Sequence, residues 1–227
     1  MGGATFYTRR SLKPDVYIGY SFMFKFLSRS LLLSYVLASG MAAVPVMAAE
    51  SSPYVYKWIG GVVLHDRGPL SDGHEHGMDV NAEVQFRPPS WRVWNMIGSP
   101  YPTLGITPNF NGETSAVYTG LTYEFGLANE TVAHYLGGIN NHMFLNLGIG
   151  AVAHNGPLHK DPVGCHEDSD CGFGHRVIAH LSVELGYKLS ETHGVGIFVD
   201  HMSHRGILPG ENEGVDHIGV RYYFHPW

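Results

Sequence analysis

The stretch 78-MDVNAEVQFR-87 alternates strictly between apolar and polar side chains. Its apolar members stand at every second position from Met78 to Phe86, and the polar members between them include Asp79 and Glu83. A period of two is that of a β-strand, because successive side chains point to opposite faces of the sheet. The stretch therefore predicts a strand with one apolar and one polar face.

The same alternation returns along the chain, interrupted by clusters of Gly, Pro, Asn and Asp, and no long segment shows the helical period of 3.6. Eight runs show it, at about 54–65, 77–87, 101–110, 114–125, 142–153, 175–188, 194–204 and 215–225. We therefore predict an all-β protein with eight antiparallel strands.

Alternation alone does not separate a membrane barrel from a soluble sandwich, whose strands also have one polar face. Three features favour the barrel: runs that reach the roughly 9 to 11 residues of a transmembrane strand, aromatic residues near the strand ends, and an export signal. The chain also ends in 221-RYYFHPW-227, which resembles the C-terminal signal of bacterial outer-membrane barrels. We expect an eight-stranded antiparallel transmembrane outer-membrane β-barrel, with an interior filled by side chains. Its outer loops are predicted near 66–76, 111–113, 154–174 and 205–214.

Residues 1–48 have the three parts of a secretory signal peptide, because Lys25 and Arg29 precede an apolar segment that ends in small residues. A glycine and a proline interrupt the apolar segment, which is shorter than the roughly 20 apolar residues of a membrane-spanning helix. We expect cleavage at its end and a single barrel domain over 49–227. Met23 would begin a signal of ordinary length and is an alternative start.

Composition narrows the class of protein further. Residues 1–48 hold five of the 14 basic and one of the 20 acidic residues, so the remaining chain has nine basic and 19 acidic residues, a net charge of −10 with histidine neutral. The basic surface of a nucleic-acid-binding protein is therefore absent. Cys165 and Cys171 lie close together in a polar stretch, which in an exported protein predicts a local disulfide. Their spacing is not that of the usual paired-cysteine zinc site.

Three polar residues interrupt the apolar rows of the last two runs. The row of 194–204 ends in His201 and Ser203, and Asp216 begins the matching row of 215–225. All three lie at the outer end across one hairpin, where an ionisable group costs less than at mid-bilayer. In such a pattern the serine attacks a carbonyl, the histidine takes its proton, and the aspartate orients the imidazole.

His180 and Ser182 have the same spacing, and Glu184 follows on the same face. These three residues are predicted at mid-strand on the inward face of a barrel too narrow to admit a lipid. We therefore expect them to form an interior polar network. The His-x-Ser spacing alone does not identify a site.

The segment 71-SDGHEHG-77 offers His74, Glu75 and His76 in an outer loop, a pattern that could bind a metal at the surface. The chain has 15 histidines, so such a cluster also arises by chance. We predict no metal and no cofactor.

The segment 201-HMSHRGILPGENEGVDHIGVRYYF-224 resembles the active-site hairpin of the PagL-type lipid A 3-O-deacylases, in which His-x-Ser is followed by a loop and an acidic residue. The resemblance implies an eight-stranded outer-membrane barrel, a Ser-His-Glu triad on its outer surface near the outer-leaflet lipid, and no metal. By position, His201 would be the base and Ser203 the nucleophile.

The chain departs from this family pattern at two positions. Asp216 stands where the family usually has glutamate, which is one methylene longer, and Glu211 or Glu213 could take its place. His204 stands directly after the serine, where the family often has asparagine. We expect the backbone N–H groups near His204 and Gly206 to stabilise the oxyanion.

Together these features predict an outer-membrane serine esterase that removes the 3-O-linked 3-hydroxyacyl chain from lipid A. Its partner would be the lipid A of lipopolysaccharide in the outer leaflet, and the resemblance allows a homodimer. The alternative is a non-enzymatic eight-stranded outer-membrane barrel that anchors, adheres or stabilises the membrane.

Overall fold

The computed structural model places the barrel residues and leaves the predicted leader outside the described part of the chain. It describes residues 53–71, 73, 75–127, 142–159, 172–204, 206–210, 212 and 214–226. All of these belong to the compact unit Val44–Trp227. The predicted signal peptide over 1–48 and the predicted disulfide between Cys165 and Cys171 fall on residues outside this set.

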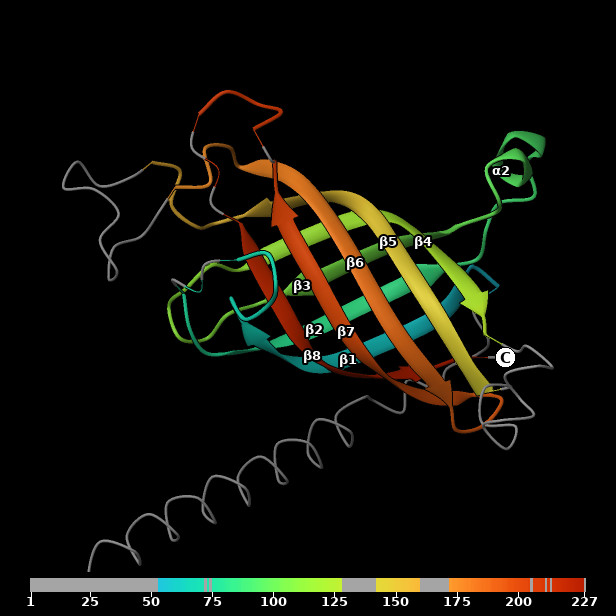
Figure 1. Ribbon diagram of the computed structural model, residues 1–227. Coiled ribbons are helices and arrows are strands. Elements are labelled where there is room, and N and C mark those ends of the chain that lie inside the picture. Colours follow the sequence, from blue (N-terminus) through green and yellow to red (C-terminus); the bar gives the residue numbers. More distant parts are fainter. Residues whose placement is uncertain are drawn as a thin grey trace, which may run out of the picture. The chain divides into compact units, whose positions relative to one another are not determined.

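Eight antiparallel strands form a closed barrel in chain order (Figure 1). They are β1 (Val55–His65), β2 (Met78–Phe86), β3 (Tyr101–Thr107), β4 (Ala116–Gly126), β5 (Met143–His154), β6 (Val177–Lys188), β7 (His193–Ser203) and β8 (Val215–Phe224). β1 pairs with β8, with Trp58 opposite Phe224 and His65 opposite His217, and this pairing closes the barrel. The predicted fold is confirmed.

Two details of the connections were not predicted. The third strand ends at Thr107, before the expected end near 110. The chain turns there because Asn109 Oδ1 accepts hydrogen bonds from the backbone N–H groups of Asn111 and Glu113. The short helix α2 (Arg92–Met96) lies between β2 and β3, at the end of the barrel where β8 ends (Figure 1). Its five residues are little more than one turn, too few to show a helical period. Among the described residues, no helix combines the length and the apolar character needed to cross a membrane.

The barrel is polar inside and apolar outside. In β2, Asp79 and Glu83 are buried in the interior, whereas Met78 and Val80 face outward and are 47% and 43% exposed. Other strands expose apolar side chains in the same way, including Leu104, Ile106, Val117, Ile149, Val183, Ile197 and Val220. This arrangement suits a barrel in lipid, because closure satisfies the backbone and the apolar face meets the acyl chains.

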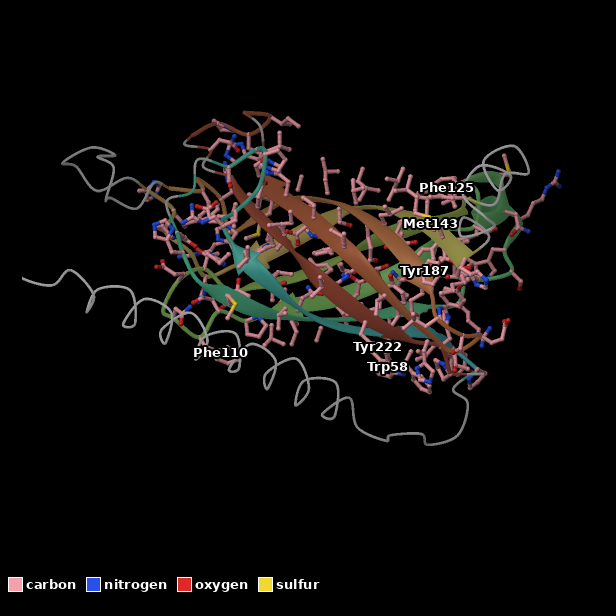
Figure 2. The ribbon with its side chains drawn as sticks, turned by 60° about the horizontal axis from the view of Figure 1, so that its bottom comes forward. Trp58, Phe110, Phe125, Met143, Tyr187 and Tyr222 are labelled. Atoms are coloured by element: carbon pink, nitrogen blue, oxygen red, sulfur yellow. The ribbon has the colours of Figure 1, made fainter. Side chains whose placement is uncertain are left out.

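Aromatic side chains gather at one end of the barrel. Trp58, Phe125, Tyr187 and Tyr222 lie at this end, and Phe110 lies toward the other (Figure 2). Such girdles mark the interfaces between the membrane and water in outer-membrane barrels.

Charged side chains inside the barrel form three layers. Their order begins at the end of the barrel where β1 starts and β8 ends. In the terminal layer, Lys57 Nζ lies 2.6 Å from Glu124 Oε2. In the central layer, Arg221 pairs with Glu83 at 2.8 Å and with Glu184 at 2.7 Å. The loop-end layer consists of His65, Glu75, Asp79, His180, Asp200 and His217. Ion pairs between buried side chains therefore run through the interior from one end of the barrel to the other.

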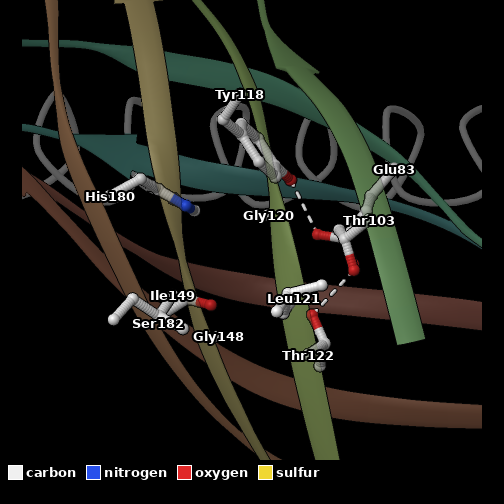
Figure 3. Close-up of a pocket in the computed structure, with 10 residues that line it drawn as sticks. All are labelled: Glu83, Thr103, Tyr118, Gly120, Leu121, Thr122, Gly148, Ile149, His180 and Ser182. Carbon is white, nitrogen blue, oxygen red and sulfur yellow. Dashed lines mark hydrogen bonds between the residues drawn. The ribbon is translucent and has the colours of Figure 1, made fainter. Parts of the chain in front are cut away.

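The second His-x-Ser pair lies in this interior. His180 Nε2 is 3.1 Å from Asp200 Oδ2, and Glu184 binds Arg221, so the predicted interior polar network is confirmed for these two residues. Ser182 and His180 line one wall of a small cavity (Figure 3). On the facing wall, the Tyr118 hydroxyl donates a hydrogen bond to Glu83. His180 and Glu184 each have a different partner, so these residues do not form a second triad.

Candidate active site

The end of β7 and the start of β8 bring the predicted catalytic side chains together. His201 lies opposite Asp216 in the β7–β8 register, and Ser203 follows His201 on the same face. Both continue the outward row of Ile197, which is 59% exposed, yet they are themselves only 9% and 5% exposed. The outward row therefore becomes covered by protein at the loop end of the barrel.

Two short contacts connect the three side chains in a line. His201 Nδ1 lies 2.5 Å from Asp216 Oδ1, and His201 Nε2 lies 2.8 Å from Ser203 Oγ. With Nδ1–H donating to the carboxylate, Nε2 is free to accept the serine hydroxyl proton. This arrangement can activate the serine as a nucleophile.

The loop between β1 and β2 holds the far oxygen of Asp216. The backbone N–H groups of Leu70 and Ser71 donate to Asp216 Oδ2 at 2.6 and 3.1 Å. Since Asp216 is 0% exposed, these donors replace the water that a carboxylate would otherwise bind. A Cβ on Gly68 would lie 2.3 Å from the same oxygen, so the loop approaches this closely only because residue 68 has no side chain. Sequence reasoning missed these contacts, because backbone amides leave no signature in a sequence.

The β7–β8 hairpin covers the other side of the imidazole. A Cβ on Gly214 would lie 2.7 Å from His201 Cε1. The backbone N–H of His204 donates to Asn212 Oδ1 at 2.8 Å, and Gly206 is exposed with φ of 69°. The oxyanion role of His204 and Gly206 stays a prediction, and Asn212 is a neighbour that the sequence pattern did not single out. Glu211 and Glu213 lie outside the described residues.

The side chains of the segment 71–77, which the sequence offered as a surface metal site, point in different directions. Glu75 turns inward, where Thr114 Oγ1 donates to it at 2.6 Å, whereas His76 contacts Arg67 at the surface. Burial alone would raise the pKa of Glu75, but hydrogen bonds from His65 and Thr114 outweigh burial and hold that pKa below its ordinary value. His74 lies outside the described residues, and the other two members do not share a site.

The sequence profile of the family described as "Lipid A 3-O-deacylase (PagL)" matches residues 76–225, which is more than half of the chain. The matched segment includes His201, Ser203 and Asp216. The chain belongs to this family. Family membership and the barrel, with its apolar outer face, together indicate an outer-membrane protein.

Solved structures of other proteins resemble the chain at low sequence identity. The outer membrane enzyme PagL is 16% identical, with 74% of this chain and 98% of that chain covered and a TM-score of 0.48. Neisserial surface protein A is 10% identical, with 78% and 98% covered and a TM-score of 0.43. The outer membrane protein Ail of Yersinia pestis is 11% identical, with 74% and 99% covered and a TM-score of 0.35. No curated protein matches the chain.

Proposed function

We propose that this protein is an outer-membrane serine esterase that hydrolyses the 3-O-linked 3-hydroxyacyl ester of lipid A, with Ser203 as nucleophile, His201 as general base and Asp216 as the orienting acid. The observation that supports this most is the unbroken line of contacts through the three side chains, in a chain of the lipid A 3-O-deacylase family.

The first half of the reaction forms an acyl-enzyme. Ser203 Oγ attacks the ester carbonyl while His201 Nε2 takes its proton, and Asp216 stabilises the imidazolium that forms. When the tetrahedral intermediate collapses, the bond between the carbonyl carbon and the sugar oxygen breaks. His201 then returns the proton to that oxygen, which leaves as the free 3-hydroxyl of the sugar.

The second half releases the fatty acid. A water molecule gives a proton to His201 and attacks the acyl-enzyme, and collapse returns the proton to Ser203 with release of the 3-hydroxy acid. The N–H groups of His204 and Gly206 are the proposed oxyanion donors. Because the His204 N–H donates to Asn212 Oδ1, the oxyanion would take the place of that oxygen.

The surroundings of the serine suit an acyl chain. In the β6–β7 register, Ser203 lies opposite Ala179 and His201 lies opposite Leu181. Both β6 residues are exposed on the outward face, where Leu181 is 45% exposed. An acyl chain on this surface would bury apolar area and bring its ester to the level of the serine. A substrate that diffuses within the leaflet reaches this face without leaving the membrane.

The test is mass spectrometry of lipid A from a Gram-negative host that lacks such an enzyme and expresses the protein. The wild-type chain should convert lipid A to a product lighter by one 3-hydroxyacyl group, and the free 3-hydroxy acid should appear. Ser203→Ala and His201→Ala should abolish both signals. Ser182→Ala is the matched control, since it removes the serine of the interior His-x-Ser pair and should leave conversion intact.

Each variant must be shown to form a barrel, by its change in electrophoretic mobility on heating. Full conversion by a folded Ser203→Ala protein would refute the nucleophile. Unchanged lipid A with the folded wild-type protein would instead favour the non-enzymatic barrel.

A further inference from the structure

The loop-end layer differs from the other two interior layers in how its carboxylates are balanced. Lysine pairs with the carboxylate of the terminal layer, and arginine pairs with both carboxylates of the central layer. In the part of the chain that the structure describes, the ion pairs of Glu75, Asp79 and Asp200 are all with histidines. Three buried carboxylates therefore stand without a permanent cation, which is costly in a low-dielectric interior.

Three side chains of this layer converge on one point. Asp79 Oδ2 lies 2.5 Å from His65 Nδ1 and 3.3 Å from His217 Nε2. One donor atom from each of the three residues lies within 4.8 Å of the others, and the three residues are buried. Donors around a tetrahedral zinc ion are about 3.3 Å apart, given Zn–N bonds of about 2.0 Å. A small withdrawal of Asp79 from His65 would make room for an ion.

The atom of His217 that faces this point contacts Asp79 at 3.3 Å without meeting the geometry of a hydrogen bond, and it has no other partner in the described part of the chain. His217 is 1% exposed, and its Nε2 is a buried polar atom without a hydrogen-bond partner among the described residues. Its Nδ1 is occupied, 2.7 Å from Asp200 Oδ1. A buried imidazole nitrogen aimed at a carboxylate and a second imidazole is the geometry of a metal ligand.

Each of the three ligands is supported from behind. Asp200 supports His217, and Glu75 supports His65 through a contact of 2.5 Å to the ring nitrogen away from the point. The second oxygen of Asp79 accepts a hydrogen bond from Asn109 Nδ2 at 2.7 Å. A carboxylate behind each ligating histidine is the usual outer shell of a protein metal site, because it fixes the ring and makes the free nitrogen a better donor.

From this convergence we propose that His65, Asp79 and His217 bind a divalent transition-metal ion of the zinc class inside the barrel, with water filling the fourth position. Two nitrogens and one carboxylate oxygen form a donor set suited to zinc and unsuited to calcium or magnesium, which prefer oxygen ligands. The ion would balance two of the three negative charges of the layer. This inference goes beyond the proposed esterase function and does not depend on it.

The ion would fasten the part of the barrel that supports the triad. Its ligands come from β1, β2 and β8, and Glu75 extends the contacts into the β1–β2 loop, the same loop that donates two N–H groups to Asp216. His217 is the chain neighbour of Asp216 and points to the opposite face of β8. The metal is therefore a structural clamp behind the active site and takes no part in the ester chemistry.

Binding is tested on the full-length barrel, purified in detergent and stripped with a chelator. The protein should take up one Zn²⁺ per chain by elemental mass spectrometry, and Co²⁺ should give the visible absorption of a tetrahedral site. Excess Ca²⁺ should not displace Co²⁺. Zinc should also raise the thermal unfolding temperature, because an ion that binds only the folded state stabilises it.

Variants assign the site. His217→Gln and the nearly isosteric Asp79→Asn should weaken zinc binding by more than about 100-fold, and Glu75→Gln by about 10- to 100-fold, as is usual for a residue behind a ligand. His154→Gln is the matched control, a buried histidine at the same end of the barrel that contacts a backbone carbonyl, and should bind like the wild type. Ser203→Ala should also bind like the wild type, which separates this proposal from the esterase.

The proposal is wrong if the stripped wild-type barrel takes up no more zinc than folded Asp79→Asn. It is equally wrong if the His154→Gln control loses binding to the same degree, or if Ca²⁺ displaces the cobalt.

Discussion

Replacing Asp216 with asparagine should move the ring proton of His201 from Nδ1 to Nε2. Asp216 Oδ2 accepts two backbone N–H groups, from Leu70 and Ser71. In Asp216→Asn the amide oxygen must take that position, because an amide NH2 there would face two donors. The NH2 then points at His201 Nδ1 and makes it an acceptor, so the ring proton moves to Nε2. His201 would donate to Ser203 and could no longer take its proton.

The expected loss in kcat is about 10⁴-fold, the cost measured for the same change in a serine protease triad, and corresponds to about 5.4 kcal/mol of transition-state stabilisation. The barrel should stay folded, because asparagine keeps the shape and every backbone contact. Activity is measured as release of 3-hydroxy acid from lipid A in detergent micelles. The ¹⁵N shifts of the His201 ring report the position of the proton independently of activity.

Two results would refute this reasoning. A folded Asp216→Asn protein within about tenfold of wild-type kcat would show that the carboxylate does not set the tautomer. Loss of activity with the proton still on Nδ1 would show that the effect has another origin. Ser182→Ala, prepared in parallel, controls for the effect of purification on activity.

Three further changes test the loop beside the site, the barrel interior and the lipid-facing surface. Gly68→Ala places a Cβ 2.3 Å from Asp216 Oδ2 and should lower kcat at least about tenfold. Gly60→Ala, with open space around it, should have no effect. Equal activity of the two variants would contradict the close approach. Arg221→Met leaves two buried glutamates without a cation and should lower the free energy of unfolding by about 3–5 kcal/mol. Denaturant unfolding in lipid measures this loss. A loss below about 1 kcal/mol would contradict the ion pairs assigned to the central layer. Val183→Arg, at mid-strand on the lipid face, should lower the free energy of unfolding by about 2–4 kcal/mol. Leu64→Arg, near the strand end, should lower it by only about 0–1 kcal/mol. Equal losses would contradict the membrane depth assigned to the two residues.

The fold and the candidate catalytic residues could be predicted from the sequence for different reasons. Alternation in 78–87 and in seven similar runs is a local property, and it predicts both the strands and the sidedness of each. His201, Ser203 and Asp216 were found because they stand at the outer ends of two apolar rows, and the family pattern agrees with their order. The bounds of β3 and the presence of α2 were missed, since an Asn side chain that turns the backbone and a single helical turn leave no periodic signal.

The contacts that support the site could not be predicted in this way. The amides of the β1–β2 loop reach Asp216 from about 145 residues away in the chain, and the proposed metal ligands His65, Asp79 and His217 stand on three strands. No spacing rule connects residues so far apart. They become neighbours only when β1 pairs with β8.

By itself, then, the sequence determines eight strands that each have one apolar face, because a period of two places successive side chains on opposite faces. The strand lengths, the aromatic residues near the strand ends and the export signal favour a membrane barrel over a sandwich. Only the tertiary structure decides which polar residues meet. His180 and His201 have the same local pattern, yet one binds Asp200 inside the barrel and the other binds Asp216 beneath a loop. The difference arises from strand register and barrel closure, which are set by long-range pairing and not by any local stretch.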